Sequence, residues 1–264
     1  MKKIYLLLSF ISFLTIGNAQ IYVDIDATSG NNNGTSWVNA YTDLQDAIDA
    51  ANANDHIWVA EGTYLPTDAP DGTTTDNRNN AFHLATNMKI YGGFDGTETQ
   101  LFARDAATNS TILSGDFNDD DVVTGSGSTL SFSNNTENAY HVMITANLTA
   151  VAVIDGFTIE GGNADGSGSI VYQSQTYFNG SGSGMSNISS SPKITNTTFS
   201  YNTAFLTGGG MNNETSSPKI TNTTFSYNRA AGLYGGGMSN LYSSPNITNT
   251  IFSYNTANQY GGGM

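Results

Sequence analysis

Apolar and polar positions recur along the last third of the chain with a period of 26 or 27 residues. Met, Ile and Phe occupy fixed phases of this repeat and are separated by Gly, Asn, Ser and Thr. The methionines lie at 185, 211, 238 and 264, the isoleucines at 194, 220 and 247, and the phenylalanines at 199, 225 and 252. Short alternating runs bounded by turn residues predict three short strands per repeat. Because the unit lacks a run of helix formers and the ladder of leucine-rich repeats, it favours one coil of a parallel β-helix.

A parallel β-helix places equivalent residues of successive coils about 4.8 Å apart. The recurring Met, Ile and Phe would then form apolar ladders inside the solenoid, where each buried side chain contributes about 1.5–3 kcal/mol. Asn202, Asn228 and Asn255 recur at a predicted turn. We expect their amides to form a ladder, with asparagine also supplying the left-handed backbone that a tight turn needs. A low-complexity surface tract, the alternative, does not account for the fixed phase of the apolar residues.

The pattern divides the chain into four segments. These are a signal peptide at 1–19, an N-terminal strand and helix cap with a first coil at 20–66, divergent coils with loops at 67–180, and regular coils at 181–264. The predicted fold class is therefore all-β, a parallel β-helix solenoid with an N-terminal capping helix.

The predicted helix lies near the start of the second segment. Residues 42–45 have capping-box spacing, and an apolar stripe follows at Leu44, Ala47, Ile48 and Ala51. The end of a solenoid exposes apolar core and unpaired strand edges. We therefore expect this helix to cover the N-terminal end of the solenoid.

The first residues have the pattern of an export signal. Lys2 and Lys3 precede an apolar run at 4–16, and the small residues Gly17 and Ala19 fit a cleavage site. A membrane-spanning helix needs about 18 or more apolar residues, so this run is too short to span. We expect an exported protein without a transmembrane helix.

Two stretches of the chain resemble known exported proteins. Residues 21–67, with Asn-Gly-Thr-Ser-Trp at 33–37, look like the opening of right-handed parallel β-helix proteins, which are pectate-lyase-like in fold and abundant in Bacteroidetes-type bacteria. The C-terminal coils are similar to the repeats of chlamydial polymorphic outer membrane proteins. The similarity lies in Gly-Gly-Gly-Met tetrads that alternate with Phe-Ser-Tyr-Asn at 199–202, 225–228 and 252–255.

The resemblance implies a right-handed solenoid, extracellular or on the outer-membrane surface of a Gram-negative bacterium. Proteins of this kind usually continue into a C-terminal sorting or anchoring domain. This chain stops inside a repeat at Met264, so we expect a truncated sequence from which that domain is absent. The fold hosts lyases, hydrolases and adhesins alike, so the resemblance does not choose among them.

Composition narrows the range of partners. Charged residues make up only 11% of the chain, and the net charge is −14 with eight lysines and arginines. Such a chain has no basic surface for a phosphate backbone, so no nucleic-acid partner is expected. The absence of cysteine excludes disulfides, thiolate zinc sites and cysteine nucleophiles. The acidic residues concentrate in the divergent coils, which predicts that any chemical site lies in the first half.

A candidate metal site lies in that acidic region. Asp116, Asn118 and Asp120 offer oxygen ligands at alternate positions, which suits a hard cation such as calcium. An EF-hand loop is not supported, because Asp121 and Gly127 stand where that loop requires Gly and Glu. The alternative is a solvated acidic loop between coils.

Catalysis finds little support in the sequence. A lyase would need a calcium cluster beside a proton-abstracting base, and basic residues are scarce. A glycoside hydrolase would need two paired carboxylates, and the pattern places no two acids on one coil face. We therefore assign no catalytic residue.

The regular coils favour recognition instead. Tyr201, Tyr227 and Tyr254 form a row that either contacts a ligand or packs along the coil edge. We expect an adhesin-like or carbohydrate-contacting passenger or stalk, with an extracellular polysaccharide or a cell-surface glycan as its partner. The alternative is a polysaccharide lyase or glycoside hydrolase on the same fold.

Overall fold

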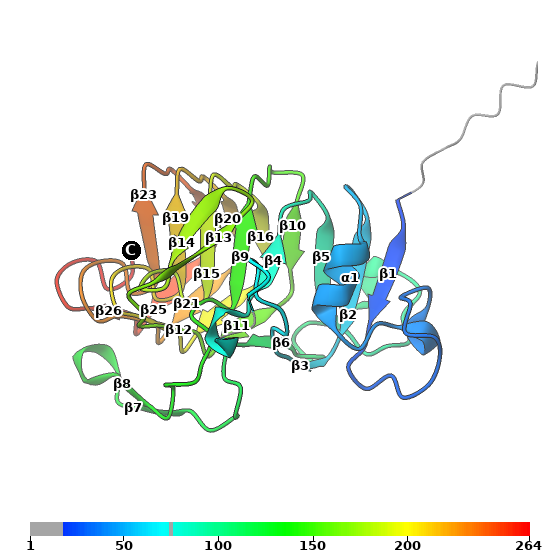
Figure 1. Cartoon of the computed structure of the whole chain (residues 1–264), viewed down its shortest axis with the longest axis horizontal. Coiled ribbons are helices and arrows are strands. Elements are labelled where there is room, and N and C mark those ends of the chain that lie inside the picture. Colours follow the sequence, from blue (N-terminus) through cyan, green and yellow to red (C-terminus); the bar gives the residue numbers. More distant parts are fainter. Residues whose placement is uncertain (1–17, 74–75) are drawn as a thin grey trace, which may run out of the picture.

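The computed structural model describes residues 18–73 and 76–264, so most of the predicted signal peptide at 1–19 lies outside the described residues. The chain winds into a parallel β-helix whose coils stack along the long axis of the molecule (Figure 1). Sheet A contains β1 (Gln20–Val23), β2 (His56–Ala60), β5 (Lys89–Phe94), β10 (Val153–Asp155), β16 (Lys193–Thr195), β20 (Lys219–Thr221) and β24 (Asn246–Thr248). Sheet B contains β3 (Gly62–Tyr64), β6 (Thr111–Ser114), β11 (Thr158–Glu160), β17 (Thr198–Ser200), β21 (Thr224–Ser226) and β25 (Ile251–Ser253).

Two further parallel sheets complete the walls. Sheet C contains β4 (Phe82–Leu84), β9 (Met143–Ala146), β15 (Met185–Ile188), β19 (Met211–Glu214) and β23 (Met238–Leu241). A narrow sheet contains β12 (Asn163–Ala164), β18 (Thr203–Ala204), β22 (Arg229–Ala230) and β26 (Thr256–Ala257). The predicted all-β solenoid of stacked parallel strands is therefore confirmed.

The predicted apolar ladders line the interior of the solenoid. The ladders in register are Met185, Met211 and Met238 in sheet C, Ile194, Ile220 and Ile247 in sheet A, and Phe199, Phe225 and Phe252 in sheet B. The phenylalanine rings stack with centroids 4.7 and 4.8 Å apart and planes within 4° of parallel. These stacks belong to one continuous apolar core that runs from the first strands to the last coils.

Asparagine side chains form ladders inside the solenoid as well. At the turn after sheet B, Asn202 Nδ2 donates to Asn228 Oδ1 at 3.1 Å, and Asn228 Nδ2 donates to Asn255 Oδ1 at 2.9 Å. This confirms the predicted amide ladder. A second ladder, which the sequence pattern did not single out, is formed in sheet C by Asn187, Asn213 and Asn240.

One detail of the predicted turn is wrong. The left-handed residue is the tyrosine that precedes each asparagine, with φ of 57° at Tyr201, 54° at Tyr227 and 56° at Tyr254. The asparagine side chains turn inward to join the ladder, so the bend falls on the residue before them. The tyrosine side chains consequently lie on the outer surface.

The predicted capping helix is present as α1 (Leu44–Ala50), which lies at the N-terminal end of the solenoid (Figure 1). Its N-cap is Asp43 rather than Thr42, because the Asp43 carboxylate accepts a hydrogen bond from Gln45 N at 2.7 Å. Ala47 and Ile48 are buried in the same apolar cluster as the first strands. The helix thereby covers core that would otherwise face solvent.

The other helices in the described part of the chain are single 3₁₀ turns in the connecting loops. They are η1 (Trp37–Asn39), η2 (Asn77–Asn79), η3 (Leu101–Ala103) and η4 (Gly127–Thr129). Within the described ranges, no helix has the length and apolar character needed to cross a membrane.

Two antiparallel hairpins interrupt the coils. One is formed by β7 (Val122–Thr124) and β8 (Ser131–Ser133), the other by β13 (Ser169–Tyr172) and β14 (Gln175–Phe178). The second hairpin packs Ile170 and Tyr177 on Ile144 and Ile188, on the outer face of sheet C. The Tyr177 hydroxyl donates to the Thr145 carbonyl at 2.9 Å. This hairpin covers one part of the sheet and leaves the part formed by the later coils open.

Candidate functional site

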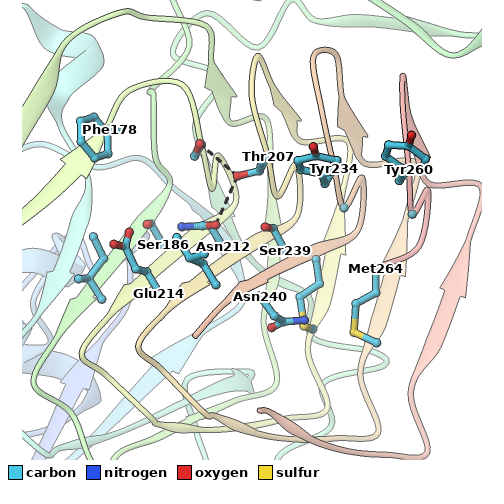
Figure 2. A pocket seen from close by; sticks show the side chains of 16 residues that line it. Phe178, Ser186, Thr207, Asn212, Glu214, Tyr234, Ser239, Asn240, Tyr260 and Met264 are labelled. Carbon is cyan, nitrogen blue, oxygen red and sulfur yellow. Dashed lines mark hydrogen bonds between the residues drawn. The ribbon is translucent and has the colours of Figure 1, made fainter. Parts of the chain in front are cut away.

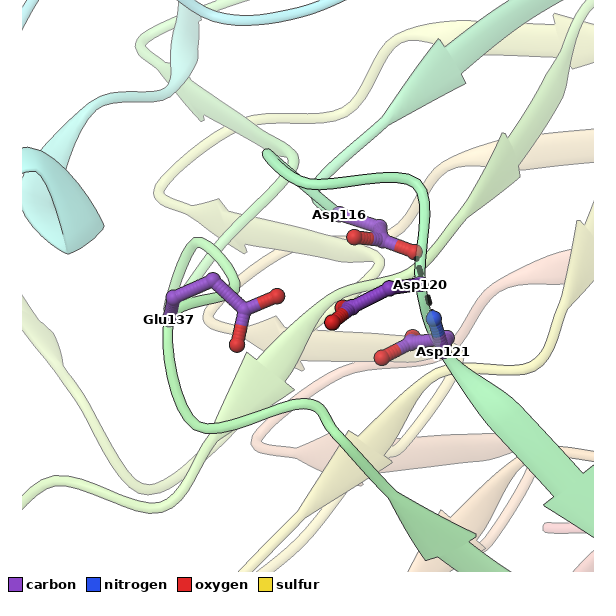
Figure 3. Close-up of side chains that lie close together, drawn as sticks. All are labelled: Asp116, Asp120, Asp121 and Glu137. Carbon is purple, nitrogen blue, oxygen red and sulfur yellow. Dashed lines mark hydrogen bonds between the residues drawn. The ribbon is translucent and has the colours of Figure 1, made fainter.

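Four acidic side chains meet beside the β7–β8 hairpin. Asp116, Asp120, Asp121 and Glu137 each offer a carboxylate oxygen, and these oxygens all lie within 4.8 Å of one another (Figure 3). The three aspartates come from the loop between β6 and β7, and Glu137 comes from the segment after β8. The hairpin therefore brings together acids from both of its ends.

Hydrogen bonds within the loop fix its shape. Asp116 Oδ1 accepts from Asn118 N at 3.1 Å, and Asp116 Oδ2 accepts from Asp121 N at 3.0 Å. The structure thus places the predicted ligands Asp116 and Asp120 in the cluster, while the Asn118 backbone supports Asp116. Sequence spacing did not single out Asp121 or Glu137, and for Glu137 no local signal exists because it lies beyond the hairpin.

Two carboxylate oxygens of the cluster lack hydrogen-bond donors in the described part of the chain. Asp121 Oδ1 and Glu137 Oε1 are both buried, and neither accepts a hydrogen bond from the described part of the chain. Burial, together with the neighbouring carboxylates, raises the pKa of Asp121 to about 7, although Asn138 Nδ2 donates to its other oxygen at 2.8 Å. Buried carboxylate oxygens without donors are costly. These four residues could hold a metal ion such as calcium, which prefers oxygen ligands.

A cleft of about 470 Å³ adjoins the cluster and is lined in part by Asn118, Glu137 and Arg78. Arg78 forms an ion pair with Asp165 at 2.6 Å and lies over the Tyr140 ring at 4.1 Å. Its Nε also donates to the Asn138 carbonyl at 2.7 Å. Arg78 therefore holds the η2 loop in place and is not available as a proton-abstracting base.

A second candidate site is a groove of about 630 Å³ that lies on the outer face of sheet C and continues over the last coil, where Met264 and the inward-facing Met238 and Asn240 also line it. Outward-facing side chains of successive strands form its floor, including the row Ser186, Asn212 and Ser239. One rim is a row of residues from the turns before these strands: Ser181, Thr207, Tyr234 and Tyr260. Phe178, at the end of the β13–β14 hairpin, lies at one end of the groove (Figure 2).

The groove combines aromatic faces with polar groups. The rings of Tyr234 and Tyr260 stack with centroids 5.8 Å apart and are 45% and 70% exposed. The polar floor residues Ser186 and Asn212, in the two preceding coils, are almost completely buried, and Ser239, in the coil of Tyr234, is half-buried. Aromatic rings that offer both an apolar face and a hydroxyl, beside a few placed polar groups, are typical of ligand-binding surfaces.

The tyrosine row singled out from the sequence lies elsewhere. Tyr201, Tyr227 and Tyr254 stack on one another along the turn after sheet B, with centroids 5.4 and 4.8 Å apart, outside the groove. Tyr201 is 40% exposed and Tyr254 is 58% exposed, so the row is both packed and accessible. The sequence pattern did not single out Tyr234 and Tyr260, although their spacing of one repeat was a usable signal.

Comparison with known proteins adds no family to this description. No family model, no curated protein and no solved structure matches the chain.

Proposed function

We propose that the protein is an exported β-helix that contacts carbohydrate chains through the groove on sheet C. The observation that carries the proposal is one groove that joins the stacked, exposed rings of Tyr234 and Tyr260 to polar floor residues of neighbouring coils. Export and display at an outer-membrane surface rest on the signal pattern, and on the resemblance to pectate-lyase-like proteins of Bacteroidetes type and to polymorphic outer membrane protein repeats.

The direction of the groove supports a polymeric ligand. The groove crosses β15, β19 and β23, so it follows the solenoid axis and offers side chains at equivalent positions about every 4.8 Å. A hexopyranose unit has a similar length, so successive sugar units of one chain can meet successive coils. The aromatic rim suits the apolar faces of sugar rings, and the polar floor suits their hydroxyl groups.

The lining of the groove favours binding over catalysis. Glycoside hydrolysis uses two carboxylates, and among the side chains that line the groove the sole carboxylate is that of Glu214. The described arginines nearest the acidic coils are also occupied, since Arg104 pairs with Asp155 at 2.6 Å as Arg78 does with Asp165. A polysaccharide lyase or hydrolase remains the second proposal, centred on the acidic cluster and its cleft.

A glycan array followed by calorimetry on the retained glycans tests the proposal. The double variant Tyr234→Ala/Tyr260→Ala removes the aromatic rim and should abolish retention. The matched control is Tyr201→Ala/Tyr254→Ala, which removes two exposed tyrosines that each stack on Tyr227 outside the groove and should leave binding intact. If only the control variant loses binding, the carbohydrate site belongs to the row of Tyr201, Tyr227 and Tyr254. If the protein produces new reducing or unsaturated ends in a glycan, the lyase or hydrolase proposal is favoured instead.

We further infer that the acidic cluster binds calcium and fixes the base of the β7–β8 hairpin. The unpaired oxygens of Asp121 and Glu137 support this inference, since a cation would supply what they lack. Calcium should raise the melting temperature, and Asp121→Asn should remove most of that rise. Asp119→Asn is the matched control, because Asp119 has the same charge in the same loop but lies outside the cluster. An unchanged melting temperature with calcium or chelator would contradict the inference.

A further inference from the structure

The groove carries one charged side chain among its lining residues, the carboxylate of Glu214. Glu214 is the last residue of β19 and faces outward from sheet C, two residues beyond Asn212. The two positions are therefore about 7 Å apart on the same face. In the neighbouring coils its register partners are Ile188 and Leu241, so the carboxylate is flanked by apolar side chains.

This carboxylate has no partner in the described structure. Its side chain takes part in no hydrogen bond among residues 18–73 and 76–264, and both ion pairs of that part of the chain involve other acids. No lysine or arginine lines the groove. Glu214 is also only partly exposed, and its apolar neighbours reduce the screening of its charge by water.

The rest of the groove is uncharged. Its floor offers the hydroxyls of Ser186 and Ser239 and the amide of Asn212, and its rim offers the hydroxyl of Thr207. An anionic ligand would meet the Glu214 charge with nothing to neutralise it, on a chain whose net charge is −14. A cationic group on the ligand would instead gain a charge-assisted hydrogen bond.

We propose that the groove selects a glycan that bears free amino groups, with Glu214 as the residue that recognises the ammonium. This inference rests on the proposed carbohydrate-binding function and names the class of ligand. Glu214 and Tyr234, which lies on the adjacent coil, are on opposite sides of the floor residue Asn212 (Figure 2), so a glycan lying over the floor would contact both sides of the groove. Uronate polymers, the substrates of lyases, are excluded from this groove by the same charge.

Three oligosaccharides of equal length test the proposal: a deacetylated glucosamine oligomer, its N-acetylated counterpart, and an oligogalacturonate. We expect the deacetylated oligomer to bind about tenfold more tightly than the N-acetylated one, as befits one charge-assisted hydrogen bond. The oligogalacturonate should not bind. Raising the ionic strength should reduce the preference for the amine, because a partly exposed charge pair is screened by salt.

Glu214→Gln keeps the shape of the side chain and removes its charge. This variant should bind the two glucosamine oligomers equally, with an unchanged melting temperature. Glu61→Gln is the matched control, since Glu61 is an exposed carboxylate outside the groove and its loss changes the net charge by the same amount. The control should keep the full preference for the amine.

The possible outcomes distinguish recognition of the amine by Glu214 from the proposed carbohydrate-binding function. Equal loss of preference in both variants would show non-specific attraction to an acidic protein and overturn the role of Glu214. Equal binding of the acetylated and deacetylated oligomers to the unaltered protein would overturn the amine inference and leave carbohydrate binding in place. Retention of the oligogalacturonate alone would also overturn it. If the glycan array retains no carbohydrate of any class, the proposed function fails and the inference fails with it.

Discussion

Replacing Asn228 by alanine is expected to lower the free energy of unfolding by about 4 kcal/mol. The Asn228 side chain is fully buried. Its Nδ2 donates to the Phe199 carbonyl at 2.8 Å and to Asn255 Oδ1 at 2.9 Å. Its Oδ1 accepts from the Asn202 backbone N at 3.2 Å and from Asn202 Nδ2 at 3.1 Å. The substitution removes all of these bonds at once.

The magnitude follows from those bonds. A net contribution of about 1 kcal/mol for each of two donated and two accepted bonds sums to about 4 kcal/mol. The partners cannot turn to solvent, because Asn202 and the Phe199 carbonyl lie inside the solenoid with the ladder. The loss is a large share of the roughly 5–15 kcal/mol that stabilises a typical domain.

Urea unfolding followed by far-UV circular dichroism measures the effect, and amide exchange at Asn202 reports the lost acceptor directly. The matched control is Asn246→Ala, which makes the same deletion on the exposed surface of β24 and should stay within about 0.5 kcal/mol. A loss below about 1 kcal/mol in Asn228→Ala, or an equal loss in the control, would refute the argument that the buried amide ladder holds the coils together.

Three further predictions follow from the interior and the hairpin. Phe225→Ala removes a fully buried ring stacked between two others and should cost about 3–5 kcal/mol in urea unfolding, whereas Phe225→Leu should cost less. Burial lowers the pKa of His141 to about 4, below its ordinary value of 6.5. Because the unfolded chain then binds this proton more readily than the folded one, the contribution of neutral His141 to the free energy of unfolding is complete above pH 6.5 and is lost as the pH falls toward 4. His141→Gln should flatten that part of the melting-temperature profile, and an unaltered slope would contradict the assignment. Tyr177→Phe deletes one hydrogen bond to the Thr145 carbonyl and should cost about 1 kcal/mol while leaving the hairpin in place, as judged by amide exchange in β14.

Much of the fold was predictable from the sequence, because a solenoid makes tertiary neighbours of residues one repeat apart. The phase of Phe199, Phe225 and Phe252 alone indicated which side chains stack. The predicted helix start at Thr42 was one residue early, since the choice between Thr42 and Asp43 as N-cap depends on local backbone geometry. Boundaries of this kind are decided by single hydrogen bonds rather than by periodicity.

The acidic cluster was predictable from the sequence only in part. Asp116 and Asp120 are close in sequence, so spacing alone pointed to them. Asp121 follows in the same loop, but Glu137 joins the cluster only because the β7–β8 hairpin brings the segment after β8 back beside that loop. Charge and spacing do not reveal which acids are buried, and burial is what raises the pKa of Asp121.

The sequence by itself determined the coil, the ladders and the absence of basic surface, because periodicity and composition are properties of the chain. Only the tertiary structure decided where a groove exists. The β13–β14 hairpin breaks the repeat, and its docking on sheet C through Tyr177 places Phe178 at one end of the groove. That docking depends on contacts between segments that no local pattern connects.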